Sequence, residues 1–538
     1  MSEANNQNTA FRPAASPLLL ALAFVLSFGL VFLVLRGGWS LGFFLAVLLT
    51  ELIFIGWQQL AVSSGSETKP AGSSAGWPVQ IVLALLIINL GFCLFLYDDI
   101  VIKIFNVLVI FALLPLQYLL ASGVFLQDWD KPDFWLEAAV SYVVRPFSGL
   151  AGFGREVVQL FQRPLPTGST KTADRRSLGT VAKIIIGLLL AIPVLLISGS
   201  LLASADQVFA DLTSQLLTNL SLNEFLTQLF LALILLPFIF SFLYSGRTRQ
   251  RFVDQDGSLF NRLGSSTKGF RIDKIILITF LTCINLLYIL FAAIQVTYLT
   301  GAFQAILPDN LTYAEYARSG FFELAGVTFI NLILVLIAIK GADRSGAAGK
   351  IVRFESLLLV AGSLVQWASA MFRMKMYIDA YGLSLQRFWV TAFMLLQLVV
   401  FLLMLIKEFQ VRFPLFKFIT AAVLLSLLML NHVNSDAWIA RHNVDRYQAT
   451  GRIDTSFFNE LSSSAVPAML ELTKADDPAV AREIARQLVS RLEPLADKEN
   501  FRWQKLNLAQ IQAKEMINDQ LDSLNGLLLS EAVELVRP

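Results

Sequence analysis

The 538-residue chain is strongly apolar, since hydrophobic residues make up 56% of it and charged residues only 15%. Soluble domains carry about 25% charged residues, and their cores could not absorb this much apolar surface. A formal net charge of +2 gives no reason to expect a nucleic-acid partner. The composition therefore predicts an integral membrane protein whose main partner is the lipid bilayer.

Apolar runs recur along the chain, and each is long enough to cross about 30 Å of hydrocarbon as a helix. A spanning segment must satisfy its own backbone hydrogen bonds, and no alternating strand pattern appears. The sequence therefore predicts an all-α, polytopic helix bundle with about eleven spans. They fall near residues 18–35, 41–61, 79–97, 101–121, 180–202, 226–245, 275–298, 320–339, 355–372, 389–406 and 416–432.

The distribution of Lys and Arg predicts the orientation of these spans. Basic residues crowd the connections at 145–176, 247–274 and 340–353, whereas neither type occurs in 37–68, 104–130, 184–246 or 275–317. Because basic loops stay on the cytoplasmic side, we expect a cytoplasmic N-terminus and an extracytoplasmic C-terminal tail. The connection that holds Arg373, Lys375 and Arg387 is the one exception to this pattern.

Three regions follow from the spans and the charge pattern. Residues 1–178 form a four-span region with an amphipathic cytoplasmic loop, in which Phe134–Phe161 is typical of an interfacial helix pair. Residues 179–432 form a seven-span core. Residues 433–538 form a polar, helical tail, where Asp477-Pro478 is a typical helix start.

The first candidate site is the segment LTYAEYARSGFFEL, residues 311–324, at the outer end of the eighth span. An ionised group inside an apolar run is costly without a partner, and such acids usually serve a function. An interfacial aromatic belt with a local ion pair is the alternative explanation. The candidate ligand-binding residues here are Tyr313, Glu315, Tyr316, Arg318 and Glu323.

The second candidate segment, AMFRMKMYIDAYGLSLQRFW, covers residues 370–389 and also lies at the predicted outer surface. Its candidate ligand-binding residues are Arg373, Tyr377, Tyr381 and Arg387. An Arg fork can hold a carboxylate with two hydrogen bonds, which makes Arg373 a natural partner for Glu323 or Glu315. The alternative is that these cations extend to lipid headgroups.

Two further groups of charges lie at or inside the spans. Glu51 is in the middle of the second run, where it is either an intramembrane proton or cation site or a protonated group bonded to a neighbouring helix. Asp98, Asp99 and Lys103 are typical of a solvated acidic turn with an extended lysine.

Motifs for catalysis and cofactor binding are absent from the sequence. His432 and His442 are ten residues apart, unlike the i, i+4 pair of a helical zinc site. A phosphate-cradling Gly-Lys-Ser/Thr loop and a Gly-x-Ser-x-Gly elbow are also missing. We therefore expect no metal, no cofactor and no catalytic residue, and a membrane enzyme is the least favoured class.

The two outer segments, together with NVDRYQATGRIDTSFFNELSSSAVPAML at 443–470, resemble a family of bacterial polytopic membrane proteins catalogued as domains of unknown function. The related families are numbered four-one-seven-three and four-one-five-three. The resemblance extends from about residue 180 into the tail, with little contribution from the first three spans. It implies a bacterial cytoplasmic membrane but no activity.

Together these features predict an outward-facing polar site that is capped by the tail and binds a small ligand or an envelope protein. A sensor of the cell envelope is the favoured function. A transporter or channel with Glu51 and Glu323 on an ion or proton path is the first alternative. A structural partner that assembles with envelope proteins is the second.

Overall fold

The fold is taken from a computed structural model of the chain. It describes residues 17–63, 77–125, 132–162, 198–199, 201–202, 204–206, 222–247, 273–303, 321–341, 346–410, 412–492 and 502–536. These residues form helices and the turns that join them, with no strand among them, so the predicted all-α class is confirmed.

Nine helices of the described ranges are long and apolar enough to cross a membrane, which makes the protein a multi-pass membrane protein. They match nine of the predicted spans. These helices are α1 (Pro17–Gly37), α2 (Leu41–Ser63), α3 (Trp77–Leu96), α4 (Ile100–Ala121), α9 (Leu222–Arg247), α11 (Lys274–Phe303), α14 (Gly346–Tyr381), α15 (Leu385–Phe409) and α16 (Leu415–Val433).

Two of the eleven predicted spans are not among these nine helices. The span predicted at 320–339 corresponds to α13 (Phe321–Gly341), whose apolar part at Gly326–Ala338 is shorter than the others. The span predicted at 180–202 lies almost wholly outside the described residues. The prediction of eleven spans is therefore neither confirmed nor contradicted at this position.

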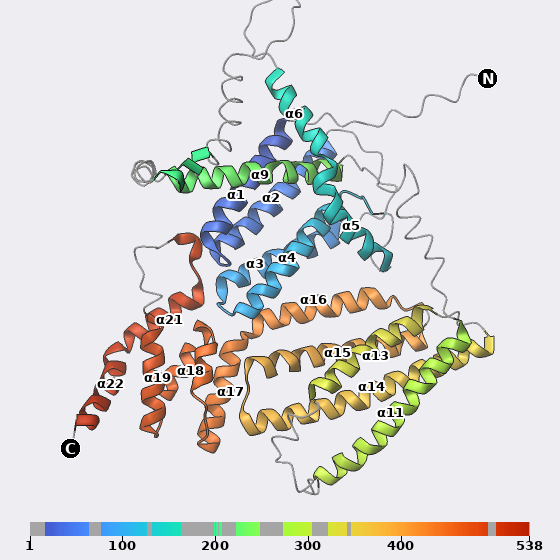
Figure 1. Cartoon of the computed structure of the whole chain (residues 1–538), viewed down its shortest axis with the longest axis vertical. Helices are drawn as coiled ribbons and strands as arrows, with labels where there is room; N and C mark the ends of the chain where they lie inside the picture. Colours follow the sequence, from blue (N-terminus) through green and yellow to red (C-terminus); the bar gives the residue numbers. More distant parts are fainter. Residues whose placement is uncertain are drawn as a thin grey trace, which may run out of the picture.

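The first bundle consists of α1–α4 and α9, and its buried apolar residues form one continuous core. Two amphipathic helices, α5 (Pro132–Ser148) and α6 (Leu150–Gln162), pack against α9. They confirm the predicted helix pair, and Figure 1 shows α6 running across the direction of α9. At their junction the Gly149 N–H donates to Ser241 Oγ over 2.7 Å, so glycine permits the close approach to α9.

The second bundle consists of α11, α13, α14, α15 and α16, which lie side by side in Figure 1. At 36 residues, α14 is about 54 Å long, well beyond the thickness of the hydrocarbon layer. It therefore extends out of the bilayer before the chain turns back into α15.

Asparagine side chains join the two bundles within the membrane. Asn106 of α4 and Asn431 of α16 are both buried and exchange two amide hydrogen bonds, of 2.6 and 2.9 Å. Close by, Asn89 of α3 contacts the His432 ring nitrogen at 3.2 Å. The apolar surroundings make these bonds necessary, because an unsatisfied amide in hydrocarbon costs several kcal/mol.

The tail continues from α16 as helices that stand at the end of both bundles (Figure 1). Its core includes Leu383 and Phe388 from the α14–α15 hairpin as well as residues of the tail itself. Membrane hairpin and tail therefore share one hydrophobic core. The tail helices are α17 (Ser435–Thr450), α18 (Val466–Leu472), α19 (Pro478–Ser490), α21 (Leu508–Asp519) and α22 (Leu521–Val536), with short 3-10 helices η1 (Ser456–Glu460), η2 (Ser463–Ala465) and η3 (Trp503–Lys505).

The asparagine pair gives a testable prediction about the joint between the bundles. Asn106→Leu or Asn431→Leu alone leaves one buried amide without its partner, and we expect each to lower the stability of the purified protein by about 1–2 kcal/mol. The double variant should recover part of this loss. A double-mutant cycle on thermal unfolding in detergent checks it, and strictly additive losses would contradict the pairing.

Candidate functional site: the junction of the tail with the membrane helices

Several connections meet the tail at one end of the bundles. Leu41 at the start of α2 donates its N–H to Leu506 O of the tail over 3.2 Å. Glu224 at the start of α9 bridges Arg36 of α1 and Arg502 of the tail, each over 2.7 Å. The α1–α2, α3–α4 and α14–α15 turns therefore share the face that carries the tail, as the predicted alternation of the spans requires.

The α3–α4 turn is held by two aspartates. Asp99 caps α4 by accepting from Val101 N over 2.7 Å, and its other oxygen accepts from Ser435 Oγ of the tail. Asp98 pairs with Lys103 over 2.7 Å and accepts from Ser463 Oγ over 3.2 Å. The prediction of a solvated acidic turn is therefore wrong, because the tail covers these carboxylates.

Helix α21 of the tail is anchored on the end of α3. The buried Asn507 caps α21 through its side-chain oxygen, which accepts from Gln510 N over 3.3 Å. The same side chain donates to Leu94 O and Tyr97 O, over 3.2 and 2.8 Å. One residue thus begins the tail helix and satisfies carbonyls that the end of α3 leaves without a partner.

The α14–α15 turn is clamped by α17. Asn443 donates to Leu383 O over 2.6 Å and accepts from Leu383 N over 3.1 Å. Gly382 has a φ of +80°, and a Cβ there would lie 2.3 Å from Asn443 Oδ1. Glycine is therefore required twice, for the left-handed backbone and for the close approach of α17.

Three of the predicted ligand-binding residues come together beside this turn. The Arg387 guanidinium lies 4.0 Å from the centre of the Tyr377 ring and 5.7 Å from that of Tyr381. It also donates to Gly382 O, while Arg446 of α17 donates to Ala380 O over 2.7 Å. These groups brace the hairpin and fasten it to the tail.

A cavity of about 320 Å³ lies between the tail and the end of α3. Its wall combines apolar side chains with hydroxyl and amide groups from four segments of the chain. It is lined by Leu96, Tyr97, Asn434, Ala437, Ser463, Ser464, Pro467, Leu508, Ala509, Gln512, Ala513 and Met516.

Two groups in this wall have unused hydrogen-bonding capacity. Ser464 is 9% exposed, and its Oγ is buried without a partner, as is Asn434 Oδ1. Asn434 is also the one non-glycine residue of the described chain with a positive φ, +50°, and its side chain does not cap α17. Strained backbone and unsatisfied polar atoms together are typical of a binding site.

Asp436 is the most perturbed acid of this region. It is 2% exposed, and burial together with the charges of Asp99 and Asp98 raises its pKa to about 6. One of its oxygens accepts from Ser462 N over 2.8 Å, and the other is buried without a hydrogen bond. The charges that face it are those of the two aspartates and of Arg491, whose pKa is lowered by burial.

The first predicted segment cannot be compared with this arrangement. Tyr313, Glu315, Tyr316 and Arg318 lie outside the described residues, and Glu323 lies in α13 without a described side chain. Arg373 is buried in α14, at 8% exposed. A site that combines both segments therefore remains a prediction.

Glu51 lies deep in the first bundle. It is 2% exposed and accepts from Gln117 Nε2 of α4 over 3.0 Å. This contact agrees with the expectation of a bond to a neighbouring helix. Its use as an ion or proton site remains a prediction.

Sequence reasoning missed Ser435, Asp436, Ser464 and Asn507, which build the junction. Serines and asparagines in a polar helical tail look like surface residues. The segment at 443–470 carried part of the family resemblance and contains Asn443, Arg446 and Ser464, but the sequence analysis singled out none of them. Clusters of three metal-binding side chains are absent from the described residues.

The protein is therefore a polytopic all-α membrane protein with a docked helical tail. This class is defined by the helical spans, by the apolar core that the hairpin and the tail share, and by the polar junction between tail and spans. The model of a family described as a domain of unknown function (DUF4153) matches residues 84–472, well over half of the chain. The protein belongs to this family.

The match begins inside α3, so the expected start near residue 180 was too late. It includes the α3–α4 turn, the α14–α15 turn and the first part of the tail. The contacts between these segments therefore lie within the family region, whereas α21 and its Asn507 lie beyond it. No curated protein and no solved structure matches the chain.

The turn at Gly382 gives a prediction with a matched control. Gly382→Ala forces a methyl group against Asn443 in a left-handed backbone, and we expect a loss of at least about 2–3 kcal/mol in stability. Gly451 has a similar φ, +68°, but open space around it. Gly451→Ala should therefore cost only about 1 kcal/mol. Thermal unfolding and protease accessibility of the tail measure both, and equal effects would contradict the clamp.

Asp436 makes docking of the tail depend on pH. Its pKa is about 6 in the folded protein and about 3.8 when exposed, so the folded state binds the extra proton between these values. Stability should therefore fall as the pH rises from about 4 to above 6, by roughly 3 kcal/mol for this group. Asp436→Asn should flatten that part of the profile. Unfolding measured at pH 4–8 checks this, and parallel wild-type and variant profiles would contradict it.

Proposed function

We propose that the protein is a sensor in the bacterial cytoplasmic membrane that binds a small polar ligand at the outer face, between its tail and α3. The observation that carries this proposal is the 320 Å³ cavity, whose wall holds the unpartnered Ser464 Oγ and Asn434 Oδ1. A ligand that meets both groups would replace the hydrogen bonds that they lack.

The chemistry of the wall favours a neutral or cationic ligand that carries hydroxyl or amine donors. Asn434 Oδ1 is an acceptor, and a serine hydroxyl both donates and accepts. Asp98 accepts from the wall residue Ser463, and Asp99 and Asp436 lie close to Asp98. The cations that face these three carboxylates are Lys103 and Arg491. The field of the carboxylates disfavours an anion at the cavity.

Signal transmission follows from where the tail is attached. It contacts α3 and α4 through Asn507 and Ser435, and the α14–α15 hairpin through Asn443. A ligand that binds one tail position more tightly than another shifts the protein toward that position. Both bundles would then move relative to each other, because both are fastened to the same tail.

An ion- or proton-coupled transporter is the second candidate, favoured by a row of polar groups in the second bundle. Asn285 donates to Glu355 over 2.6 Å, and Asn331 donates to Gln366 over 3.1 Å. These side chains come from α11, α13 and α14. A flux into liposomes that Glu355→Gln reduces would favour transport over sensing.

Two serine substitutions test the ligand-binding site of the proposed sensor. We expect amine- and polyol-bearing fragments, but not carboxylate fragments, to raise the melting temperature of the purified protein. Ser464→Ala should abolish this shift. Ser462→Ala is the matched control, because Ser462 belongs to the same segment as Ser464 but does not line the cavity.

Equal loss of the shift in both variants, or a shift caused by carboxylate fragments alone, would contradict the proposed site. Reporter fusions after residues 254 and 460 test the orientation separately. The proposal requires a cytoplasmic reporter at 254 and an extracytoplasmic one at 460.

A further inference from the structure

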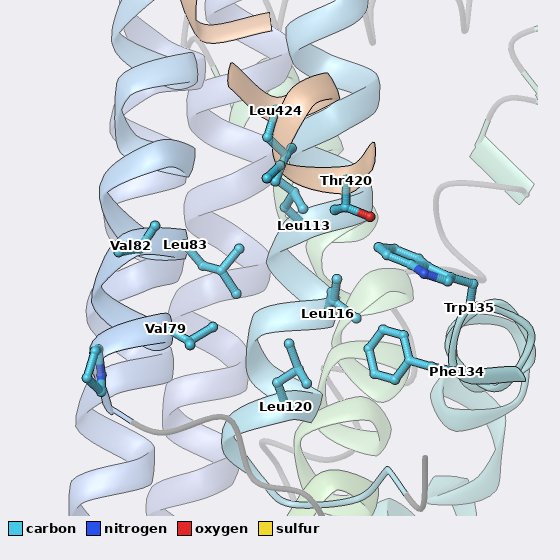
Figure 2. A pocket seen from close by; sticks show the side chains of 12 residues that line it. Val79, Val82, Leu83, Leu113, Leu116, Leu120, Phe134, Trp135, Thr420 and Leu424 are labelled. Atoms are coloured by element: carbon cyan, nitrogen blue, oxygen red, sulfur yellow. The ribbon is translucent and has the colours of Figure 1, made fainter. Parts of the chain in front are cut away.

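A second cavity lies at the opposite end of the membrane helices from the tail. It is an apolar groove of about 320 Å³ in which α3, α4 and α5 face the first turns of α16. Figure 2 shows Trp135 and Phe134 of α5 beside it, with Thr420 and Leu424 of α16 above. It is lined by Pro78, Val79, Val82, Leu83, Leu113, Leu116, Leu120, Phe134, Trp135, Thr420, Ala421 and Leu424.

The groove has a fixed floor and an open side. Leu116 and Phe134 in the floor are 5% and 1% exposed, so the protein itself holds them in place. Val82 and Trp135 in the walls are 63% and 37% exposed. Except for the Thr420 hydroxyl, the lining side chains carry only hydrocarbon or aromatic surface toward the groove.

The position of the groove along the spanning helices determines which medium surrounds it. The lining residues of α3, α4 and α16 belong to spanning helices, so the open side faces the bilayer. Leu113 and Leu120 are seven residues apart, which gives the groove a length of about 10 Å along α4. Pro78 lies at the first turn of α3, so the groove opens at the headgroup level of the leaflet opposite the tail.

We propose that this groove binds an acyl chain of a membrane phospholipid from that leaflet. The hydrocarbon of the bilayer faces the opening of the groove. A water molecule inside the groove would find almost no hydrogen-bonding partner. If the groove were empty, its lining side chains would lack dispersion contacts on that side. An acyl chain that enters the groove supplies these contacts.

The ring of Trp135 stands at the mouth, where tryptophan favours the interface. The bound chain would fill the space between α16 and the first bundle, and so brace the two bundles at the end that the tail does not reach.

A photoactivatable phospholipid tests this proposal. The full-length protein is reconstituted into phosphatidylethanolamine–phosphatidylglycerol vesicles that contain a lipid with a diazirine in its acyl chain. After illumination, the adducts are mapped by mass spectrometry. We expect them to concentrate on peptides that contain Val82–Leu83 and Leu113–Leu120.

Ala421→Trp fills the groove and should lower these adducts severalfold. Val423→Trp is the matched control, because Val423 is 43% exposed on the same helix but does not line the groove. It should leave the adducts unchanged. Val82→Trp fills the groove from the opposite wall, should Ala421→Trp prevent folding.

Two results would overturn the proposal. One is an even spread of adducts over all bilayer-facing helices that neither groove-filling variant changes. The other is labelling of other bilayer-facing peptides with no adducts on the groove peptides, as expected if another copy of the chain or another segment of it fills the groove. Because the groove and the tail cavity lie at opposite ends, neither result bears on the sensor.

Discussion

Hydrocarbon surrounds the membrane helices on all sides, so apolar burial does little to hold one helix bundle against another. The Asn106–Asn431 pair therefore has a structural importance that it would not have in water. Each amide is buried, and each would lose both hydrogen bonds of the pair if α16 moved away from α4. This pair holds the last turn of α16, in the second bundle, against α4 in the first.

The tail joins the two bundles a second time, at the ends of the spanning helices. Leu383 and Phe388 of the hairpin enter its apolar core, while Asn443 satisfies the backbone of the same turn. On the other bundle, Ser435 donates to the Asp99 carboxylate of the α3–α4 turn, and Asn507 donates to a backbone carbonyl after α3. Burial of apolar side chains and backbone hydrogen bonding therefore act together at the ends of the helices that face the tail, where contact with lipid alone would not hold the helices together.

The sequence predicted the helical class and most spans, because run length and the need for internal hydrogen bonds leave few alternatives. It failed at Asp98 and Asp99, whose partner Ser435 is 336 residues from Asp99 along the chain. In a sequence, an acidic turn that is exposed to water cannot be distinguished from one that a distant domain covers. Arg387, Tyr377 and Tyr381 lie together because one helix turn and one hairpin bring them there, whereas their predicted role in ligand binding stays a prediction. The cavity at Ser464 depends on four separate segments, and no local pattern reports such an arrangement.

Helix α14 has a mechanical consequence. Its 36 residues form one uninterrupted rod, about 54 Å long, whose last turn is held by the tail. A rod of this length acts as a lever. A tilt of a few degrees at the tail moves Gly346, at the other end, by several ångström. A small adjustment around the α14–α15 turn would thus appear, enlarged, at the opposite surface of the membrane without any helix having to break.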